Sequence, residues 1–242
     1  MTHDMPERRR DLLVALLTLI TGVVDAACFL HLGHVFGSVV TGTMVLLGVA
    51  AGTHDPALAE HCGVGLAAYI CGVLIGAPIA VRSRAGRSAG PPATWPPSVT
   101  AALAVEFCTL TACCVGWELQ GGRPAGAGQL VVLAFVAASM GIQSASVRQL
   151  GELSTTYLTG TLTGVVASFT AWRKPEGLAR SLAIFAALIA GALASAIVTA
   201  HAPGWLPVLV LLPLAVVLAL SGARSGALPE LRRGAGPRRS RR

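Results

Sequence analysis

Apolar residues in this sequence form long runs that are separated by short polar and basic segments. A helix that crosses about 30 Å of hydrocarbon needs roughly 20 mostly apolar residues, and six runs reach or approach that length. The four tryptophans lie at the ends of the runs, where aromatic rings favour the level of the lipid headgroups. The pattern predicts six membrane-spanning helices, at Leu12–Leu32, Ala57–Val81, Val99–Trp117, Leu130–Val147, Leu178–His201 and Trp205–Ser221.

Two further apolar stretches, Val35–Ala51 and Tyr157–Trp172, are shorter and rich in Gly, Thr and Ser. Because Lys and Arg concentrate on cytoplasmic loops, their distribution helps to decide whether these stretches cross the membrane. If both cross, Arg148 and the arginines of the segment 82–94 lie outside the cell. If each enters the membrane and returns to the same side, Arg123 is the only basic residue outside. The bias favours six crossings plus two re-entrant segments, with both termini cytoplasmic.

Composition excludes a soluble protein. Apolar residues make up 54% of the chain, charged residues 12%, and the mean hydropathy is +0.70, whereas soluble domains carry about 25% charged residues. A soluble enzyme, a nucleic-acid-binding module and a disordered protein are therefore excluded. The net charge of +7 does not indicate a nucleic-acid partner, because the basic residues form short clusters between apolar runs. The partner that the composition requires is the lipid bilayer.

Patterns typical of catalysis or metal binding are not found in the sequence. It contains no Walker loop, no Ser-His arrangement, no zinc-protease motif and no dinucleotide fingerprint, and its six cysteines form no C-x-x-C pair. His31 and His34 have a spacing that can share a metal on one helical face, but no second strong pair accompanies them. We therefore expect no enzymatic activity, no cofactor and no bound metal.

Two stretches of the chain align without a gap when the sequence is shifted by 118 residues. Gly22 and Gly141 lie close to this alignment, one residue out of register. Chance similarity in a sequence rich in Ala, Gly and Leu is the alternative to a true internal repeat. The matching residues are Asp25 with Gln143, Leu32-Gly33 with Leu150-Gly151, and Thr41-Gly42-Thr43 with Thr159-Gly160-Thr161.

The repeat predicts an all-α integral membrane protein made of two pseudo-symmetric halves. Each half has three crossing helices and one T-G-T segment, and an odd number of crossings gives the halves opposite orientations. Broken helices that meet near the midplane of inverted repeats are a recurring transporter design, and Gly allows the break. The alternative is that both T-G-T segments are ordinary packed helices whose Thr hydroxyls bond to their own turn.

The predicted units follow from these spans. They are a cytoplasmic N-terminus (1–11), a first membrane repeat (12–117), an extracytoplasmic linker (118–129), a second membrane repeat (130–222) and a basic cytoplasmic tail (223–242).

Two motifs carry a resemblance to a known family. The pattern G-x-x-D-A-x-x-F-L-x-L-G-x-V-F-x-x-x-x-T-G-T runs from Gly22 to Thr43, and M-G-I-Q-S-A-x-V-R-x-L-G followed by T-T-x-L-T-G-T-L-T runs from Met140 to Thr163. Both resemble the signature of the YoaK family of small bacterial membrane proteins, and the likeness extends from about Leu12 to Ser221. Family members commonly carry T-G-N where this chain has Thr43, so a side-chain amide there is not essential. The resemblance implies a membrane protein with about six spans and supplies no substrate.

Polar residues inside the predicted spans are the candidates for a functional site. An ionisable group at the depth of Asp25 costs about 2.5–3.5 kcal/mol on insertion scales and is a functional candidate by default. Its carboxylate could bind a cation or carry a proton, or it could cap a broken segment structurally. Glu106 and Arg148 are secondary candidates, although Arg148 can equally extend to the headgroups. The predicted solute- or ion-binding residues are Asp25, Thr41, Gly42, Thr43, Gln143, Ser144, Thr159, Gly160 and Thr161.

These features predict a polytopic protein of the bacterial inner membrane that moves a small solute or ion. The alternative is a non-transporting scaffold or assembly protein that packs through small-residue faces such as Gly72-x-x-x-Gly76. A transporter predicts a polar cavity that reaches Asp25, whereas a scaffold predicts a dry, fully packed interior. The identity of the solute is not encoded in any motif, and assembly into homo-oligomers stays open.

Overall fold

The computed structural model describes residues 7–81, 95–150, 158–170 and 177–222. These residues form helices joined by short turns, and no strand occurs among them. Two short 3₁₀ turns, Arg148–Leu150 and Pro203–Trp205, extend the ends of helices. The helices are α1 (Glu7–His31), α2 (Val40–Thr53), α3 (Pro56–Val81), α4 (Pro97–Leu119), α5 (Gly126–Val147), α6 (Leu158–Thr170), α7 (Leu178–His201) and α8 (Leu206–Gly222).

Local sequence explains where several helices begin. Pro56 and Pro97 are the first residues of α3 and α4, where the missing N–H has no helical partner to lose and the ring presets the backbone. His54, between α2 and α3, has a positive φ of 56°. Gly121 and Gly122 also have positive φ and reverse the chain between α4 and α5. Elements of opposite direction are therefore joined by tight turns rather than by long loops.

Six helices are long and apolar enough to cross a membrane, as the sequence predicted. They cover every predicted span, and their ends differ from the predicted ends by a few residues. Helices α2 and α6 are apolar but shorter. The fold is thus an all-α bundle of six candidate membrane spans and two short helices, which confirms the predicted fold class.

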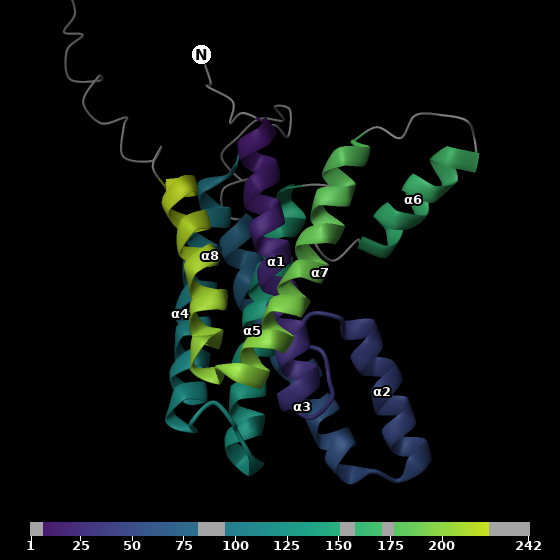
Figure 1. Ribbon diagram of the computed structural model, residues 1–242, viewed down its shortest axis with the longest axis vertical. Coiled ribbons are helices and arrows are strands. Elements are labelled where there is room, and N and C mark those ends of the chain that lie inside the picture. Colours follow the sequence, from purple (N-terminus) through teal and green to yellow (C-terminus); the bar gives the residue numbers. More distant parts are fainter. Residues whose placement is uncertain (1–6, 82–94, 151–157, 171–176, 223–242) are drawn as a thin grey trace, which may run out of the picture.

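The central helices of the bundle are α1 and α5. About two-thirds of the residues in their apolar windows are buried (67% in each), against 22% in α3 and in α7. Helix α1 packs along α7 and α5 packs along α3 and α4, whereas α1 and α5 touch each other only lightly. Helix α8 closes the bundle against α1 and α4 (Figure 1).

Two close helix crossings depend on glycine. A Cβ atom on Gly22 of α1 would lie 2.1 Å from the carbonyl oxygen of Leu188 in α7, and one on Gly191 would lie 2.1 Å from that of Leu19. Backbones can approach this closely only where the side chain is a hydrogen atom. The α1–α7 pair is therefore held by backbone contact at its centre.

The second crossing joins α3 and α5 in the same way. A Cβ atom on Gly72 of α3 would lie 2.0 Å from the carbonyl oxygen of Ala138, and one on Gly141 of α5 would lie 2.2 Å from that of Tyr69. The bundle thus contains two tightly joined pairs, α1–α7 and α3–α5.

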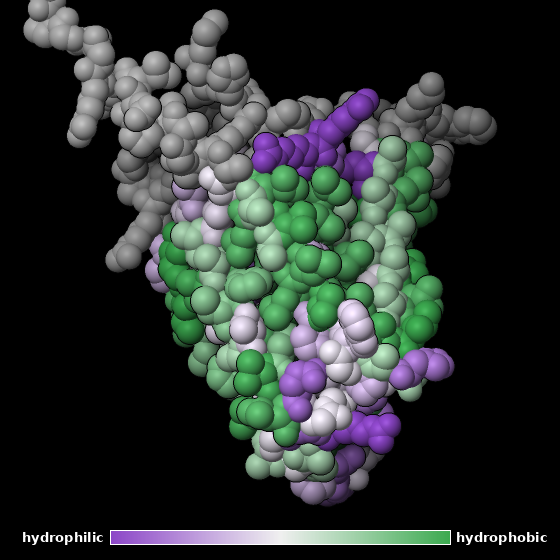
Figure 2. Space-filling model, turned by 60° about the vertical axis from the view of Figure 1, so that its left-hand side comes forward, coloured by the Kyte–Doolittle hydropathy of each residue, from purple (hydrophilic) through white to green (hydrophobic). Residues whose placement is uncertain are grey.

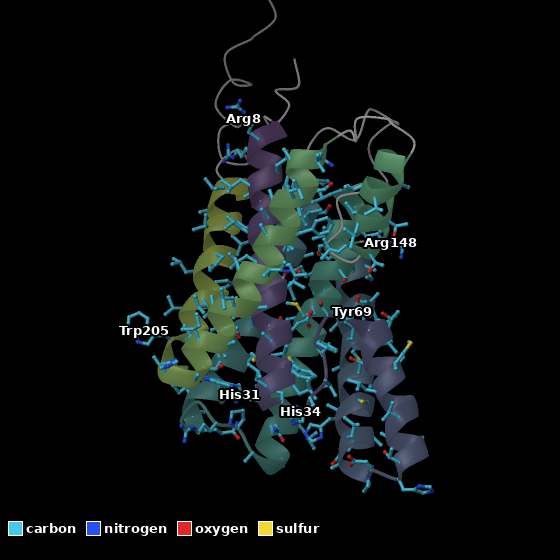
Figure 3. The ribbon with its side chains drawn as sticks, turned by 45° about the vertical axis from the view of Figure 1, so that its right-hand side comes forward. Arg8, His31, His34, Tyr69, Arg148 and Trp205 are labelled. Atoms are coloured by element: carbon cyan, nitrogen blue, oxygen red, sulfur yellow. The ribbon has the colours of Figure 1, made fainter. Side chains whose placement is uncertain are left out.

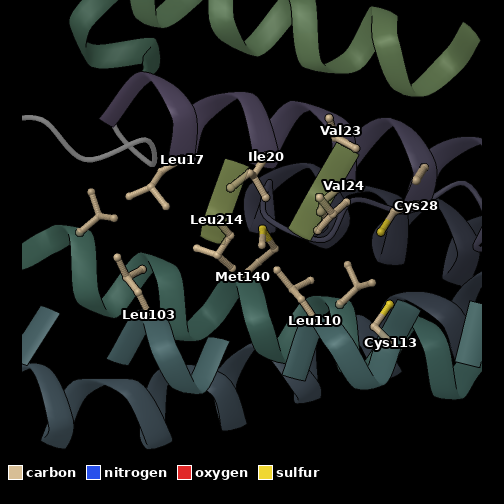
Figure 4. Packing of buried hydrophobic residues seen from close by; sticks show 14 of the residues in the cluster. Leu17, Ile20, Val23, Val24, Cys28, Leu103, Leu110, Cys113, Met140 and Leu214 are labelled. Carbon is tan, nitrogen blue, oxygen red and sulfur yellow. The ribbon is translucent and has the colours of Figure 1, made fainter. Parts of the chain in front are cut away.

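A continuous apolar core fills the space between α1, α4, α5 and α8 (Figure 4). The side chains at its centre include Leu17 and Ile20 of α1, Leu103 of α4, Met140 of α5 and Leu214 of α8, all of them buried. On the outside, large apolar side chains cover the middle of the molecule, while hydrophilic residues gather at its two ends (Figure 2). This distribution is the one that a lipid bilayer solvates.

Arginines at the start of α1 bind the ends of two other helices. Arg9 donates a hydrogen bond from Nη2 to the carbonyl oxygen of Leu220 in α8, and Arg10 Nη2 lies 2.6 Å from that of Leu150. Carbonyls at a helix C-terminus lack helical partners and carry partial negative charge, so cations stabilise them. The start of α1 therefore fixes the same end of α8 and α5, close to the Arg180–Asp11 ion pair of 2.7 Å.

Helices α2 and α6 occupy opposite halves of the molecule (Figure 1). After α1 ends, the chain turns back, and α2 begins near the middle of the bundle and runs to the end where α1 finished. Helix α6 also begins near the middle but runs to the other end, where α7 starts. Helix α2 packs on α3, whereas α6 contacts α7 lightly and is largely exposed.

Candidate functional site

Asp25 is buried near the end of α1 and binds the segment that leads to α2. Its Oδ1 accepts a hydrogen bond from the backbone N–H of Ser38 at 2.8 Å, and its Oδ2 accepts one from the Ser38 hydroxyl at 2.5 Å. Two such bonds to an ionised acceptor are strong. Asp25 therefore anchors the turn before α2, which corresponds to the structural alternative that the sequence left open.

Thr43 strengthens the same turn from the other side. Its hydroxyl oxygen is 3.1 Å from the carbonyl oxygen of Phe36, 3.3 Å from that of Val39 and 3.3 Å from the Phe36 nitrogen. Thr43 is buried, and Gly42 lies close to the Phe36 ring, with an added Cβ 3.2 Å away. The first T-G-T segment thus forms the first turn of α2 and is fastened to the chain before it.

The second T-G-T segment has a different environment. Thr159 and Gly160 are exposed and Thr161 is half-buried in the first turn of α6, and a Cβ on Gly160 would meet nothing within 4 Å. Both T-G-T segments are helical, so the breaks that were expected at Gly42 and Gly160 do not occur there. The change of direction occurs before α2, in residues 32–39, and the corresponding residues before α6 lie outside the described part of the chain.

A buried polar cluster joins three helices at the centre of the bundle. Gln143 of α5 donates from Nε2 to Oε1 of Glu106 in α4 at 2.9 Å. The Thr21 hydroxyl of α1 lies 3.0 Å from Oε1 of Gln143 and 3.0 Å from the carbonyl oxygen of Leu17. All three side chains are at most 4% exposed. We call Thr21, Gln143 and Glu106 the central triad.

The carboxyl group of Glu106 is only half satisfied within this triad. Its Oε1 accepts the bond from Gln143, but Oε2 is buried and has no hydrogen-bond partner among the residues that the structure describes. Leaving a polar atom unpaired in an apolar interior costs free energy, and leaving a charge there costs more. Glu106 therefore stands out more sharply than Asp25, although the sequence ranked it lower.

The remaining predicted residues lie around this centre or away from it. Ser144 follows Gln143 on α5 and is hydrogen-bonded to the Tyr69 side chain of α3, which lies half-way along the molecule (Figure 3). Arg148 is exposed at the end of α5 (Figure 3). Asp25 is one helical turn from Thr21 on α1, so Asp25 and Gln143 lie near each other but bind different partners.

Thr21, Ser38 and Tyr69 take part in the site and were not singled out in the sequence. Thr21 and Tyr69 sit in apolar runs, where a lone hydroxyl usually bonds to its own helix. Their roles come from contacts with α5, which no local pattern reports. One sequence signal could have pointed to Thr21: it lies four residues before Asp25, which places both side chains on one face of α1.

An apolar cavity lies beside the polar cluster, towards the end where α1 finishes. It is lined by α1, α4, α5 and α8, including Cys28, Cys113 and Trp117, and its lining exposes no polar surface. Trp117 donates from Nε1 to the carbonyl oxygen of Pro203 at 3.1 Å and closes this end. The cavity is suited to apolar contact, so it is not the polar cavity reaching Asp25 that a transporter predicts.

Histidines gather at the same end of the molecule (Figure 3). His61 of α3 lies 3.1 Å from Oε1 of Gln129, whose Nε2 donates to the His31 carbonyl at 2.7 Å. Gly33 has φ of 88°, and an added Cβ would lie 2.1 Å from the His61 ring. No group of three or more His, Cys, Asp or Glu that could hold a metal occurs in the described ranges.

Comparisons with known proteins agree with the resemblance seen in the sequence. Residues 13–221 match a family model described as "Protein of unknown function (DUF1275)". The chain belongs to this family. It is also 34% identical over 160 residues to UPF0700 transmembrane protein YoaK of Bacillus subtilis (strain 168). That match covers 65% of this chain and 66% of the relative, just under two-thirds of its length, and no solved structure matches.

Membership of the DUF1275 family confirms the predicted YoaK resemblance. Together with the six apolar helices, the transmembrane relative supports a polytopic membrane protein that sits in a lipid bilayer. The family description names no activity, so the function of this DUF1275 chain is argued from its own residues.

Proposed function

We propose that this DUF1275 protein is a transporter or channel of the bacterial inner membrane that moves a small solute or ion past the central triad. The observation that carries the proposal is the placement of α2 and α6, which both begin near the middle of the bundle and run to opposite ends (Figure 1). Short helices that begin at membrane depth are tolerated where the polar backbone before them is satisfied by protein or by a water-filled path. Transporters use such half-helices at their binding sites.

The glycine crossings support an inverted repeat behind this placement. Gly22 on α1 and Gly141 on α5 are 119 residues apart, and so are Gly72 on α3 and Gly191 on α7. The residues that they contact obey the same shift, since Leu19 corresponds to Ala138 and Tyr69 to Leu188. This shift differs by one from the 118 that aligns the T-G-T segments, which explains why Gly22 and Gly141 fall one residue out of register in the sequence.

The repeat would relate the α1–α7 pair to the α3–α5 pair. Helix α1 runs from the N-terminal end of the bundle to the far end, and α5 runs the opposite way (Figure 1). A two-fold axis in the membrane plane would account for this inversion. The proposed motion is a tilt of one glycine-joined pair against the other, because contact within each pair is close and contact between α1 and α5 is light.

We propose that the start of α1 and the end of α8 both face the cytoplasm. Arg8, Arg9, Arg10 and Arg180 lie at the end where α1 and α7 start, whereas Arg123 lies in the α4–α5 turn at the other end. An excess of arginine on one face is typical of the cytoplasmic side. The predicted basic tail, residues 223–242, falls outside the described residues.

Water access to the centre tests the proposal without knowledge of the solute. Ser144→Cys in a protein that lacks the native cysteines should react with a small hydrophilic thiol reagent in intact vesicles, because a transport path brings water to the triad. The matched control is a protein that retains only native Cys113, which is buried in the apolar core and should stay unreactive. A folded Ser144→Cys protein that is as unreactive as the control would contradict transport.

A second function, a scaffold or assembly protein, is favoured by one specific observation. Gly48 and Gly52 on α2, and Gly160 and Gly164 on α6, each have nothing within 4 Å of an added Cβ. Four-residue spacing of small residues allows a second helix to approach closely. This alternative predicts a dry centre, so protection of Ser144→Cys would favour it.

A further inference from the structure

Glu106 has no charged partner on the helices that pack against α4. Helices α5 and α8 carry no ionisable side chain between Gly126 and Val147 or between Leu206 and Gly222. Helix α3 carries Glu60, His61 and Cys62 near its start, and Tyr69 and Cys71 in its middle; Tyr69 is bonded to Ser144 and Cys71 is exposed. On α4 itself, Cys108 is exposed and Cys113, Cys114 and Glu118 lie towards the far end. No counter-charge therefore balances an ionised Glu106 among these helices.

Helix α1 is linked to Glu106 only through Gln143. The nearest carboxyl group on α1 belongs to Asp25, which already accepts hydrogen bonds. Asp25 accepts two hydrogen bonds from Ser38, so its ionised form is well satisfied. A buried carboxylate without a counter-charge carries a penalty that protonation removes. The two buried carboxyl groups therefore differ in how well hydrogen bonds satisfy their ionised forms.

The hydrogen bonds of the central triad have two alternative arrangements. The Thr21 hydroxyl has one hydrogen but two acceptors at 3.0 Å, Oε1 of Gln143 and the carbonyl oxygen of Leu17. When Thr21 donates to Gln143, the Gln143 amide donates to an ionised Glu106. When Thr21 donates to Leu17, its oxygen can accept from a rotated Gln143 amide, whose oxygen then accepts from a protonated Glu106. Each arrangement pairs the Thr21 hydroxyl and one N–H of the Gln143 amide, and in both Oε2 of Glu106 has no partner among the described residues.

We propose that Glu106 is a proton-binding site, and that binding and release of its proton reverse the hydrogen bonds that run through Gln143 to Thr21. The step is balanced: a hydronium ion gives one proton to Oε1 of Glu106 and leaves as water, the amide of Gln143 turns over, and no other covalent bond is made or broken. In the loaded state, in which Glu106 carries the proton, Oε2 is an uncharged oxygen, and an apolar environment tolerates it. The loaded state is the one expected at neutral pH.

The triad lies where the two glycine-joined pairs meet. Thr21 precedes Gly22, which is at the α1–α7 crossing, and Gln143 follows Gly141, which is at the α3–α5 crossing. A change in hydrogen bonding between Thr21 and Gln143 therefore acts across the boundary between the pairs. If the protein is a transporter, this proton is its coupling ion; that consequence rests on the proposed function, whereas the proton site does not.

Infrared spectroscopy of the protein in lipid vesicles tests the proton site directly. At neutral pH the wild-type protein should show the carbonyl-stretch band of a protonated carboxylic acid, and the band should fall as the pH is raised. Glu106→Gln should lose the band. Asp25→Asn should retain it, because the proton is assigned to Glu106, and so should Glu118→Gln, which changes an exposed carboxylate on the same helix.

Thr21→Val tests the relay and does not require Glu106 to be replaced. Valine keeps the shape of threonine but removes the hydroxyl, so the Glu106 band should shift in frequency as its Gln143 partner loses the second bond. An absent band in the wild type, or a band that persists in Glu106→Gln, would overturn the proton site. An unchanged frequency in Thr21→Val would overturn the relay. A band that behaves as expected in vesicles where Ser144→Cys is protected from water would support the proton site and count against transport.

Discussion

At the scale of single residues, two buried carboxyl groups with different neighbours define the chemistry of this bundle. Asp25 has both oxygens bonded to Ser38, while Glu106 has one oxygen bonded to Gln143 and one without a partner. Asp25 therefore holds the turn before α2, and Glu106 is the group whose charge can change. A residue that anchors a turn should affect stability, and this can be measured at Ser38.

Ser38→Ala should lower the stability of the protein by about 1.5–3 kcal/mol, the usual contribution of a hydrogen bond to a charged group. The change removes the hydroxyl bond to Asp25 Oδ2 and keeps the backbone bond to Oδ1. Thermal unfolding in detergent micelles measures the effect. Ser168→Ala is the control, because the Ser168 hydroxyl bonds an exposed carbonyl of its own helix, and its midpoint should stay within error of the wild type. Equal midpoints for the two variants would show that Asp25 is not an anchor.

Gly33 is a second residue whose role is defined by a distant side chain. Its φ of 88° favours glycine, and the His61 ring occupies the space that a side chain would need. Gly33→Ala should therefore lower the unfolding midpoint through both backbone strain, about 1–2 kcal/mol, and overpacking, about 1–3 kcal/mol. Gly121→Ala is the control, since its φ is also positive but no atom lies within 4 Å of an added Cβ. If both variants lose the same stability, the His61 contact contributes nothing.

Charge made Asp25 and Glu106 visible in the sequence, but their partners were not predictable. Thr21 and Ser38 are ordinary hydroxyl residues, and only the packing of α1 against α5 and the turn after α1 gives them a role. The Leu32-Gly33 pair was recognised as part of a repeated motif, yet its fit to His61 depends on where α3 begins. A sequence reports which residues are costly to bury, and the fold determines which neighbours satisfy them.

At the scale of elements, hydropathy predicted the six long helices because span length is set by the thickness of the bilayer. The T-G-T segments were harder to predict, because Gly and Thr are compatible with either a helix or a break. In the structure both segments are helical from their first turn, and the reversal before α2 is made by residues 32–39. Close helix packing was expected at Gly72-x-x-x-Gly76, and both glycines meet α5. The contacts of Gly22, Gly141 and Gly191 were not predicted, since only partner helices distinguish them from open glycines.

Replacement of the crossing glycines should separate the helix pairs. Gly22→Ala and Gly141→Ala would each place a methyl group about 2 Å from a backbone carbonyl oxygen of α7 or α3, and backbone cannot move aside as a side chain can. We expect each variant to lose about 1–3 kcal/mol or more. Gly48→Ala lies inside α2 and faces open space among the described residues, so it should be neutral or more stable by up to about 1 kcal/mol. The midpoint of thermal unfolding compares the three, and losses at Gly22 alone would contradict the equivalence of the two pairs.

At the scale of the whole molecule, an apolar band separates two hydrophilic ends (Figure 2). Composition predicted this, because a chain with 12% charged residues cannot cover its surface with them. The arginines predicted the orientation, and Arg8, Arg9, Arg10 and Arg180 lie at the end where α1 and α7 start, whereas Arg123 lies at the other end. The return of α2 and α6 to the side from which they enter is a prediction. The inverted repeat and the proposed path through the centre both rest on it.

The most direct test of this account is the side on which the α2–α3 turn lies. Single cysteines are introduced as Thr53→Cys, Ala125→Cys and Gly177→Cys into a protein without its native cysteines, and intact cells are treated with a membrane-impermeant maleimide. Thr53→Cys and Ala125→Cys should react from outside, while Gly177→Cys should react only after the membrane is opened. Protection of Thr53→Cys, Ala125→Cys and Gly177→Cys together in intact cells would mean that α2 crosses the membrane, and it would contradict the re-entrant helices and the inverted repeat together.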